Sequence, residues 1–458
     1  MRNKILKNKV HIVWLQDILR DRLSEDIQLT LEEKNKNVWK IKFPFSKKFI
    51  SLSYISSLYK SGYNPNLPCG YIKLTKNYPG LIDLSLPSPG LDKNPRKIFI
   101  QNNDFFHINY DIIGLIYWCL TRSEEVNIPE IYLDKHKRFS SIYSHAYKNN
   151  YLQRPIVDEW INLLKELIKQ FIPNITFKEF HFKQYITHDV DSPARYALKS
   201  KYSFFKQIFY NLLKKDADID FSESLKIYTS SKKFIHQNDP HNTFKWLMDK
   251  SEELNTFSSF NFFSGITNKK LDASYRLDHL AIVNLIKSIK SRGHNIGIHP
   301  SYETYKNYSL FKKEENNFFE LMNQIKIDQN EWGGRMHYLR WSWPYTGLLW
   351  SDSRFNYDSS LGYADSPGFR CGTCHEFRMF DPKSQKILNF KQRPLIFMEC
   401  SVLDRKYQNL GYNKDSIKSI ICLKDACKIV NGTFTILWHN SYFRSYKDKN
   451  FYTEVIEN

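Results

Sequence analysis

The sequence predicts an α/β fold in which parallel βα units close into a barrel, preceded by a smaller mixed α+β region. Three observations predict this fold. The chain has 458 residues, which is more than one ordinary domain needs. From about residue 180 onward, short β-rich runs alternate with helical segments, as they do in parallel βα units. Before about residue 175, strand-like and helical pieces are mixed without that alternation.

The first region, 1–175, is predicted to be an N-terminal accessory domain. It contains strand-like pieces at 38–43 and 97–101. The apolar run at 112–120 has about half of the roughly 20 residues that a membrane-spanning helix needs, so we interpret it as a buried element. A helix is predicted at 157–170, because its apolar residues recur at the spacing of one helical face.

The second region, 176–458, supplies the predicted barrel. Its clearest helix spans 278–292, where apolar residues share one face and Gly293 follows in the place of a C-cap glycine. The same patterns predict strands at 183–188, 257–263, 295–299, 336–341 and 434–438, and helices at 202–213 and 310–327. The strands of such a barrel end on one face, so we expect polar residues that follow different strands to meet there.

The composition indicates a globular protein with a basic surface. Hydrophobic residues make up 41% and charged residues 25%, which excludes a disordered, collagen-like or coiled-coil chain. The 67 Lys and Arg residues exceed the 48 Asp and Glu residues and give a net charge of +19. Such a surface attracts phosphorylated sugars, nucleic acid or an acidic lipid leaflet, although a lysine-rich composition alone also explains it. No helix-turn-helix, zinc-finger or RNA-recognition signature is visible, so we expect no specific nucleic-acid partner.

The N-terminus and the cysteines predict a cytoplasmic protein. The apolar stretch 10–15 is interrupted by His11 and does not resemble the core of a signal peptide. The seven cysteines, an odd number, are expected to be reduced thiols. We interpret the Cys371-x-x-Cys374 spacing as a loop with structural thiols rather than as a redox or zinc motif. Peripheral contact with an anionic membrane at its inner face fits the basic charge.

Four polar clusters follow strand-like runs and carry the residue types of a hydrolytic site. They lie at 187–191, 293–300, 340–345 and 437–440. Carboxylates and imidazoles can hold a divalent cation, which polarises a carbonyl and lowers the pKa of water, while a free carboxylate accepts a proton and a separate histidine donates one. Two carboxylates as close as Asp189 and Asp191 repel each other unless a cation or an arginine offsets them.

The order and spacing of these clusters resemble a known family. The set Thr-x-Asp-x-Asp, Gly-His-x-Ile-Gly-x-His, Arg…Pro-Tyr and Leu-x-His looks like the polysaccharide deacetylase family, the NodB-homology group of carbohydrate esterases. The resemblance covers roughly residues 180–445 and, through the stretches 299–302, 335–341 and 368–374, extends to a divergent branch associated with bacterial surface-polysaccharide gene clusters. Residues 1–175 resemble only an accessory region in front of some bacterial members. The resemblance implies a distorted (β/α) barrel and a hydrolase of carbon–nitrogen, non-peptide bonds.

The resemblance also implies roles for individual residues. Asp189 corresponds to the catalytic base and Asp191 to the metal-binding carboxylate, although Val190 separates them where the commonest pattern has adjacent aspartates. His299 corresponds to the first metal-binding histidine. Glu303 stands where the family usually supplies the second, so we interpret it as a metal ligand, with a solvated side chain as the alternative. The implied cofactor is a divalent metal ion, zinc before cobalt or manganese.

The remaining roles are assigned in the same way. Arg340 corresponds best to the arginine that orients the base, and Arg335 is the alternative. His439 corresponds to the general acid. The residues expected to contact or support the substrate are Tyr345, Trp341, Arg370 and Asp358. The aromatic stretch 332–350 fits a stacking platform for sugar rings and ordinary core packing equally well.

Together these observations predict a metal-dependent deacetylase. Its substrate would be an N-acetyl or O-acetyl group of a glycan or sugar precursor in bacterial surface-polysaccharide biosynthesis. The alternative is a catalytically inactive protein of the same fold that binds glycan or scaffolds a polysaccharide assembly system, because Glu303 replaces a ligand histidine. Convergence of Asp191, His299 and a third ligand at metal-binding distance would favour the enzyme.

Overall fold

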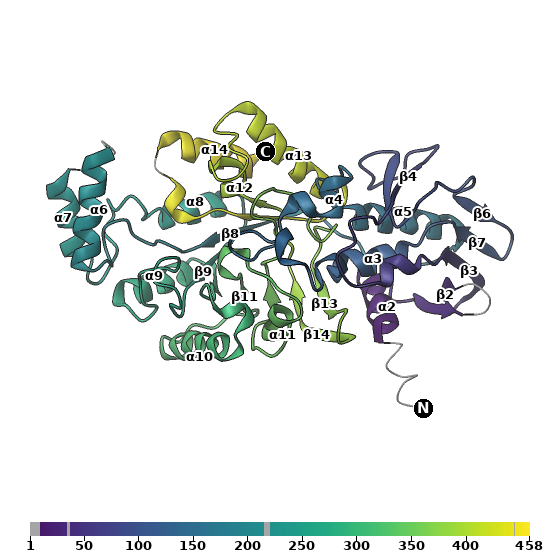
Figure 1. Ribbon diagram of the computed structural model, residues 1–458, viewed down its shortest axis with the longest axis horizontal. Coiled ribbons are helices and arrows are strands. Elements are labelled where there is room, and N and C mark those ends of the chain that lie inside the picture. The colour runs from purple at the N-terminus through teal and green to yellow at the C-terminus, as the bar shows by residue number, and fades with distance from the viewer. Residues whose placement is uncertain (1–9, 34–36, 215–219, 444) are drawn as a thin grey trace.

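A nine-stranded sheet forms the centre of the molecule (Figure 1). The computed structural model describes residues 10–33, 37–214, 220–443 and 445–458. In spatial order the strands are β13 (Phe377–Asp381), β14 (Lys386–Gln392), β12 (Tyr357–Asp358), β11 (Gly333–Gly334), β10 (Asn295–Ile298), β9 (Ser258–Phe262), β8 (Lys183–Asp189), β16 (Thr433–Leu437) and β15 (Phe397–Met398). Neighbouring strands are parallel except for the antiparallel pair β13 and β14.

The α/β class is confirmed, but the described residues do not show a closed barrel. The strand order begins at β13 and ends at β15, and no pairing between these two strands is seen in the described part of the chain. β15 has only two residues before the chain turns into helix α12 (Glu399–Leu403), so it offers little backbone for a further partner. On the opposite side, helix α2 (Val10–Arg22) covers β13 and β14: Nε1 of Trp14 donates to the carbonyl of Arg378 at 2.8 Å.

Helices follow most strands of the central sheet, and all of them except α6 and α7, which form a hairpin with a separate apolar cluster, lie beside the sheet (Figure 1). They are α6 (Lys201–Lys214), α7 (Phe221–Ser230) and α8 (Phe244–Glu253) between β8 and β9, α9 (Leu280–Ser291) before β10, α10 (Tyr308–Gln324) and α11 (Tyr345–Ser351) on either side of β11, and α13 (Lys414–Ile429) and α14 (Tyr446–Glu457) flanking β16. In α9, Ile282, Ile286 and Ile289 are fully buried, which is the stripe that the sequence predicts.

The N-terminal region is built around a second sheet and three helices, of which α3 and α5 are largely buried. The sheet has the order β1 (Gln28–Glu32), β2 (Val38–Phe43), β3 (Ser46–Ser53), β7 (Phe105–Ile108) and β6 (Phe99–Gln101), and a separate pair joins β4 (Cys69–Lys73) to β5 (Ser85–Pro89). The helices are α3 (Ile112–Leu120), α4 (His145–Lys148) and α5 (Ile156–Phe171). Every residue of α3 is buried, so the apolar run is a core helix.

The two regions are tied together by buried polar contacts. Arg370 donates to both carboxylate oxygens of Glu125, at 3.0 and 2.6 Å, and the two side chains are almost fully buried. The backbone N–H of Val157 in α5 donates to the carbonyl of Gly372 at 2.9 Å. The two regions therefore pack as neighbours, and the division at residue 175 stays a prediction.

Most predicted elements match the structure to within two or three residues, with one exception. The predicted strand at 336–341 is wrong: the strand β11 is only Gly333–Gly334, and His337–Leu339 form a 3₁₀ turn. Tyr338 and Leu339 have positive φ angles of 61° and 56°, which a strand does not contain. None of the helices described is long and apolar enough to span a bilayer.

Candidate metal and catalytic site

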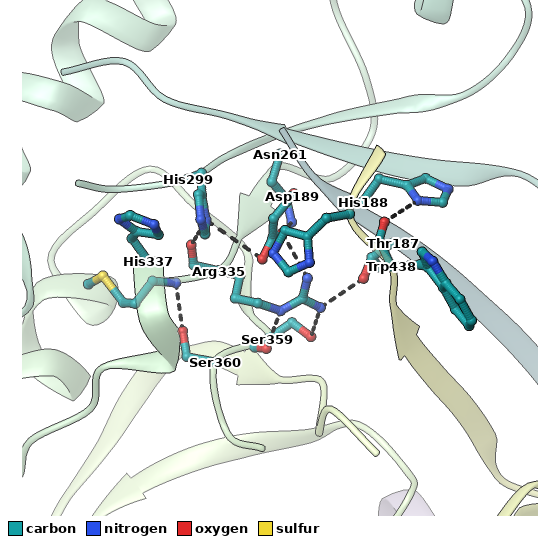
Figure 2. A network of polar contacts seen from close by, with 12 residues as sticks. Thr187, His188, Asp189, Asn261, His299, Arg335, His337, Ser359, Ser360 and Trp438 are labelled. Atoms are coloured by element: carbon teal, nitrogen blue, oxygen red, sulfur yellow. Dashed lines mark hydrogen bonds and ion pairs between the residues drawn. The ribbon is translucent and has the colours of Figure 1, made fainter. Parts of the chain in front are cut away.

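The polar clusters that follow four parallel strands meet at the carboxyl ends of those strands. β8 brings Asp189 and, two residues further on, Asp191, while β10 is followed by His299. β11 is followed by Arg335 and His337, and His439 comes two residues after β16. Asp191 and His439, separated by about 250 positions, therefore lie close together, as expected for parallel strands that end at one edge. Figure 2 shows Asp189, His299, Arg335 and His337 of this group.

Three of these side chains form a candidate metal triad: Asp191, His299 and His337. One ligand atom from each lies within 4.8 Å of the others. Nε2 of His299 is 3.2 Å from Oδ1 of Asp191, and Nε2 of His337 is 3.7 Å from Oδ2 of the same carboxylate. Ligand atoms around a tetrahedral zinc ion stand about 3.3 Å apart, as bond lengths near 2.0–2.1 Å require. The spacing of the triad therefore suits one cation.

The hydrogen bonds of the two histidines leave their Nε2 atoms as acceptors. Nδ1 of His299 is 2.6 Å from the carbonyl oxygen of Arg335, so this nitrogen must donate and the neutral ring carries its lone pair on Nε2. Nδ1 of His337 lies 2.9 Å from Oδ1 of Asp272, which fixes that ring in the same way. A carboxylate or carbonyl behind a histidine is the arrangement that orients metal-ligating imidazoles.

Two buried atoms of the triad have no hydrogen-bond partner among the residues that the structure describes. They are Oδ1 of Asp191 and Nε2 of His299, which face each other. Both are acceptors when the histidine is neutral, so their proximity is unfavourable unless a proton or a cation lies between them. The donor set of one carboxylate and two imidazoles fits zinc, and also cobalt or manganese. The Asp191 side chain is 34% exposed, so the triad is reachable from outside.

Asp189 lies beside the triad and is held by Arg335. Nη1 of Arg335 and Nδ2 of Asn261 donate to Oδ1 of Asp189 at 2.9 and 2.7 Å. Oδ2 points to the triad, 3.9 Å from Nδ1 of His299. Burial alone would raise the pKa of Asp189, but the Arg335 guanidinium and His299 outweigh it and hold the pKa below its usual value. Asp189 is therefore ionised at neutral pH.

Arg335 is itself fixed by a complete set of acceptors. Its Nε donates to the carbonyl of Ser359 at 2.9 Å, and its Nη2 donates to the hydroxyls of Thr187 and Ser359 at 2.9 and 3.0 Å (Figure 2). The side chain is fully buried. Because every donor group is directed, the guanidinium can hold Asp189 in only one orientation.

Gly297 provides the space for Asn261. The two residues are partners in the parallel pairing of β9 with β10. A Cβ atom at position 297 would collide with Oδ1 of Asn261 and would also approach the carbonyl of Gly333 to 2.8 Å. The glycine of the Gly-His-x-Ile-Gly-x-His motif therefore allows the amide of Asn261 to reach Asp189.

On the other side of Asp191, His439 is paired with a buried glutamate. Nδ1 of His439 is 2.5 Å from Oε1 of Glu399, and its Nε2 is 3.6 Å from Oδ2 of Asp191. Burial would lower the pKa of His439, but the Glu399 carboxylate outweighs it and raises the pKa well above the usual value. His439 is thus held protonated with one N–H directed at the site.

Two sequence predictions concern residues that the structure keeps outside the triad. Glu303 lies on the surface with 47% of its side chain exposed and pairs with Nη1 of Arg340 at 3.6 Å. Arg340 does not contact Asp189: its Nε donates to the carbonyl of His136 at 3.0 Å, and its guanidinium packs over the ring of Tyr305 at 3.6 Å. His337 occupies the position expected of Glu303, and Arg335 the position expected of Arg340.

The four expected substrate residues are also dispersed. Asp358 is fully buried, and its two oxygens accept bonds from the hydroxyl and backbone N–H of Ser360; burial raises its pKa to about 6. Arg370 is 3% exposed, and its guanidinium is hydrogen-bonded to Glu125. Trp341 is 5% exposed and packs edge to face on Trp343. Only Tyr345, 53% exposed, presents a ring to solvent.

Several site residues carry a weak signal in the sequence or none. Arg335 and His337 are two residues apart, but the strand predicted at 336–341 includes His337 and hides the turn that directs it inward. Glu399 follows a strand of two residues, which is too short to predict. Asp272 belongs to the loop between β9 and α9, where no periodicity marks it. Asn261 appears as one polar residue inside a buried strand.

Segments of the N-terminal region complete the rim of the site. The ring of His136 lies 4.4 Å from the ring of Tyr338, and its Nδ1 is 3.1 Å from the hydroxyl of Tyr302. Tyr338 in turn contacts the ring of His337 at 4.6 Å. Arg138 donates to the carbonyl of Tyr338 at 3.0 Å. The first region therefore holds the turn that carries one of the triad histidines.

Comparison with protein families, curated proteins and solved structures gives few similarities. The profile of a family of unknown function, DUF7033, matches residues 8–173, which is less than half of the chain. No curated protein matches the sequence. Among solved structures, the chain is similar to one described as "putative polysaccharide deacetylase from Mycobacterium smegmatis", at 15% identity and a TM-score of 0.38, over 61% of this chain and 85% of that chain. The chain thus has a distant likeness to a deacetylase structure and candidate metal-ligand groups of its own.

Proposed function

We propose that the protein is a metal-dependent deacetylase that hydrolyses an N-acetyl or O-acetyl group of a glycan or sugar precursor. The observation that carries the proposal is the pair of unpartnered buried acceptors, Oδ1 of Asp191 and Nε2 of His299, 3.2 Å apart. The resemblance of the ordered motifs to polysaccharide deacetylases supports the reaction class.

Asp191, His299 and His337 would hold the cation. A divalent ion bound there supplies Lewis acidity, which polarises the acyl carbonyl and makes a water molecule easier to deprotonate. Asp272 and the carbonyl of Arg335 keep the two imidazoles in the tautomer that such binding requires. Zinc is the expected ion, and cobalt or manganese would suit the same ligands.

The protons are handled by two residues on opposite sides of Asp191. Asp189 accepts the proton of the attacking water through Oδ2, because Oδ1 is taken by Arg335 and Asn261. His439 donates the proton that the leaving amine or alcohol requires, and Glu399 keeps it protonated for that purpose. Arg335 acts as a positioning residue for Asp189.

The alternative is a catalytically inactive protein that binds glycan or serves as a scaffold, and the main reason for considering it no longer holds. That alternative rests on Glu303 in place of a ligand histidine. Since His337 offers a third ligand atom from another strand, the replacement at position 303 no longer implies an incomplete metal set.

The wider setting is also a proposal. The resemblance to the divergent bacterial branch supports a role in surface-polysaccharide biosynthesis, with an acetylated sugar or glycan precursor as substrate. A net charge of +19 favours a precursor that carries phosphate, and a site of action at the cytoplasmic face of the membrane.

The test is acetate release by the purified protein. We expect release from N-acetylated amino sugars, either nucleotide-linked or polymeric, after addition of Zn²⁺, Co²⁺ or Mn²⁺, and loss of release after chelation. Asp189→Asn serves as the inactive control that keeps the metal ligands. No release with any of these metals, from a protein that retains none of them, would contradict the proposal.

A further inference from the structure

A helical hairpin projects from the molecule immediately after the site. It comprises α6 and α7 with their flanking residues 199–200 and 231–234, and we call it the α6–α7 hairpin. It is inserted between β8 and β9, starting eight residues after Asp191. In Figure 1 it forms the left end of the long axis of the molecule, opposite the N-terminal region.

The outer face of α6 carries exposed aromatic residues. Tyr202, Phe205 and Phe209 are 77%, 55% and 63% exposed. Their spacing of three and four residues places them on one face of the helix. Further exposed apolar side chains of the hairpin are Tyr210, Phe221, Leu225 and Phe234. Single exposed aromatic residues are ordinary on protein surfaces, but a contiguous group of this kind marks an interaction site.

These aromatic residues are not the core of the hairpin. A separate cluster of buried residues, Tyr196, Phe204, Ile208 and Ile227, holds the two helices together. On α6, Phe204 and Ile208 point inward while the exposed stripe points outward. The hairpin therefore has enough apolar contact to fold without the outer stripe, which no residue in the described part of the chain covers.

Positive charge surrounds the stripe. Among the hairpin residues whose side chains the structure describes, the lysines at positions 199, 201, 206, 226, 232 and 233 outnumber the acidic residues at positions 220 and 223. Lys206 lies on α6 between Phe205 and Phe209 and is exposed. Aromatic rings flanked by long cationic side chains are the composition of helices that lie in the headgroup region of a bilayer.

We propose that the α6–α7 hairpin docks this protein on an anionic lipid bilayer. The stripe of Tyr202, Phe205 and Phe209 would enter the headgroup–acyl boundary, and the lysines would contact acidic headgroups. An anionic bilayer meets both features at once, whereas a protein groove would have to be apolar and acidic over the same area. The interaction is independent of the deacetylase reaction.

The base of the hairpin is fixed to the rim of the site. Asp239 accepts hydrogen bonds from the backbone N–H groups of Arg195 and Tyr196 at 2.6 and 3.0 Å. Nδ2 of Asn440, next to the candidate acid His439, donates to the carbonyl of Ser192 at 2.9 Å. The hairpin is thus anchored at its base to the segment that follows Asp191 and to the residue that follows His439.

The test is sedimentation of the full chain with lipid vesicles, which measures no catalysis. We expect binding to vesicles of phosphatidylcholine with phosphatidylglycerol, weaker binding to phosphatidylcholine alone, and weakening by salt. The double variant Phe205→Ser/Phe209→Ser is expected to bind at least about tenfold more weakly, because two apolar side chains no longer enter the interface.

The matched control is Tyr308→Ser/Tyr446→Ser, which removes two aromatic side chains, 53% and 79% exposed, away from the hairpin. It should bind vesicles as the unmodified chain does, and thermal unfolding should show that both variants are folded. Equal binding of the two double variants, or no binding to anionic vesicles, would overturn the proposal. So would a dimer in solution that only Phe205→Ser/Phe209→Ser dissociates, because the stripe would then contact a second copy.

Discussion

Among the described residues, three groups of side chains could hold a metal ion; one of them is the pair of Glu399 and His439 with Cys400, and the other two each contain an aspartate and a histidine but have different surroundings. One of these two is the triad of Asp191, His299 and His337 at the carboxyl edge of the sheet. The other is Asp158, Cys374 and His375, at the contact between the two regions. In both, one ligand atom from each residue lies within 4.8 Å of the others. Residue type and spacing therefore do not separate them.

The hydrogen bonds distinguish the triad from the second cluster. In the second cluster, Oδ1 of Asp158 accepts bonds from Arg22 and Thr373, both at 2.7 Å, and Oδ2 accepts from the N–H of Cys374 at 2.9 Å. Nε2 of His375 is 3.2 Å from the carbonyl of Val430. In the triad, by contrast, two buried atoms have no partner in the described part of the chain. The triad therefore has two acceptors left open, whereas the acceptors of Asp158 are already used by other residues of the protein.

The largest effect is expected at the base beside the triad. Asp189→Asn should lower the rate of acetate release about 1000-fold, because the amide cannot accept the proton of the attacking water. Metal content should be unchanged, since Asp189 is not one of the triad ligands. Measuring kcat/KM and bound metal on the same preparation checks both the lower rate and the unchanged metal content. A similar rate in this variant would assign the base elsewhere.

Asp158→Asn tests the structural cluster. We expect it to lower the free energy of unfolding by about 3 kcal/mol, because it leaves the buried guanidinium of Arg22 without its anionic partner. The rate per folded molecule and the metal content should not change. Chemical denaturation monitored by tryptophan fluorescence gives the stability. Loss of metal without loss of stability would show that the two clusters had been assigned the wrong way round.

Asp272→Asn should weaken metal binding about 10- to 100-fold and leave the fold intact. The carboxylate holds Nδ1 of His337 and so keeps its Nε2 available as a ligand atom. Competition with a chromophoric chelator measures the affinity. Unchanged affinity would mean that His337 does not need this support.

Glu399→Gln should move the alkaline limb of the pH–rate profile to lower pH. The reaction requires protonated His439, so activity falls as the pH rises through the pKa of that group. The Glu399 carboxylate raises this pKa, and the neutral amide would let burial lower it again. We expect a shift of more than about one pH unit, which corresponds to about 1.4 kcal/mol. A limb that stays in place would exclude His439 as the acid.

Glu303→Gln is expected to have the smallest effect, less than about twofold on the rate and none on metal content. The side chain is 47% exposed, and ion pairs of this kind contribute little. Loss of the metal in this variant would show that Glu303 is the third ligand, as the family resemblance implies, and that His337 is not.

The sequence predicts more of the fold than of the site, for physical reasons. Long helices such as α9 and buried strands such as β8 have strong periodicity, and their bounds agree closely with the prediction. The site lies in turns after short strands, where side-chain direction depends on local φ angles such as that of Tyr338. Asp189, Asp191, His299 and His439 can be found from the sequence because each closely follows a recognisable strand.

The choice of arginine illustrates the remaining difficulty. Arg335 and Arg340 both lie in the same stretch, and the family resemblance favours Arg340. Only the position of β11, two residues long, directs Arg335 to Asp189 and leaves Arg340 over the ring of Tyr305. The packing of the surrounding elements determines which arginine contacts Asp189, and the pattern of residue types does not predict it.

The most direct test of the metal assignment is a titration of three proteins after complete removal of metal: the unmodified chain, His337→Ala and Cys374→Ser. Calorimetry with Zn²⁺ should give one site in the unmodified chain and in Cys374→Ser, and at least about 100-fold weaker binding in His337→Ala. Tight binding that survives in His337→Ala and disappears in Cys374→Ser would contradict the assignment of the metal to the carboxyl edge of the sheet.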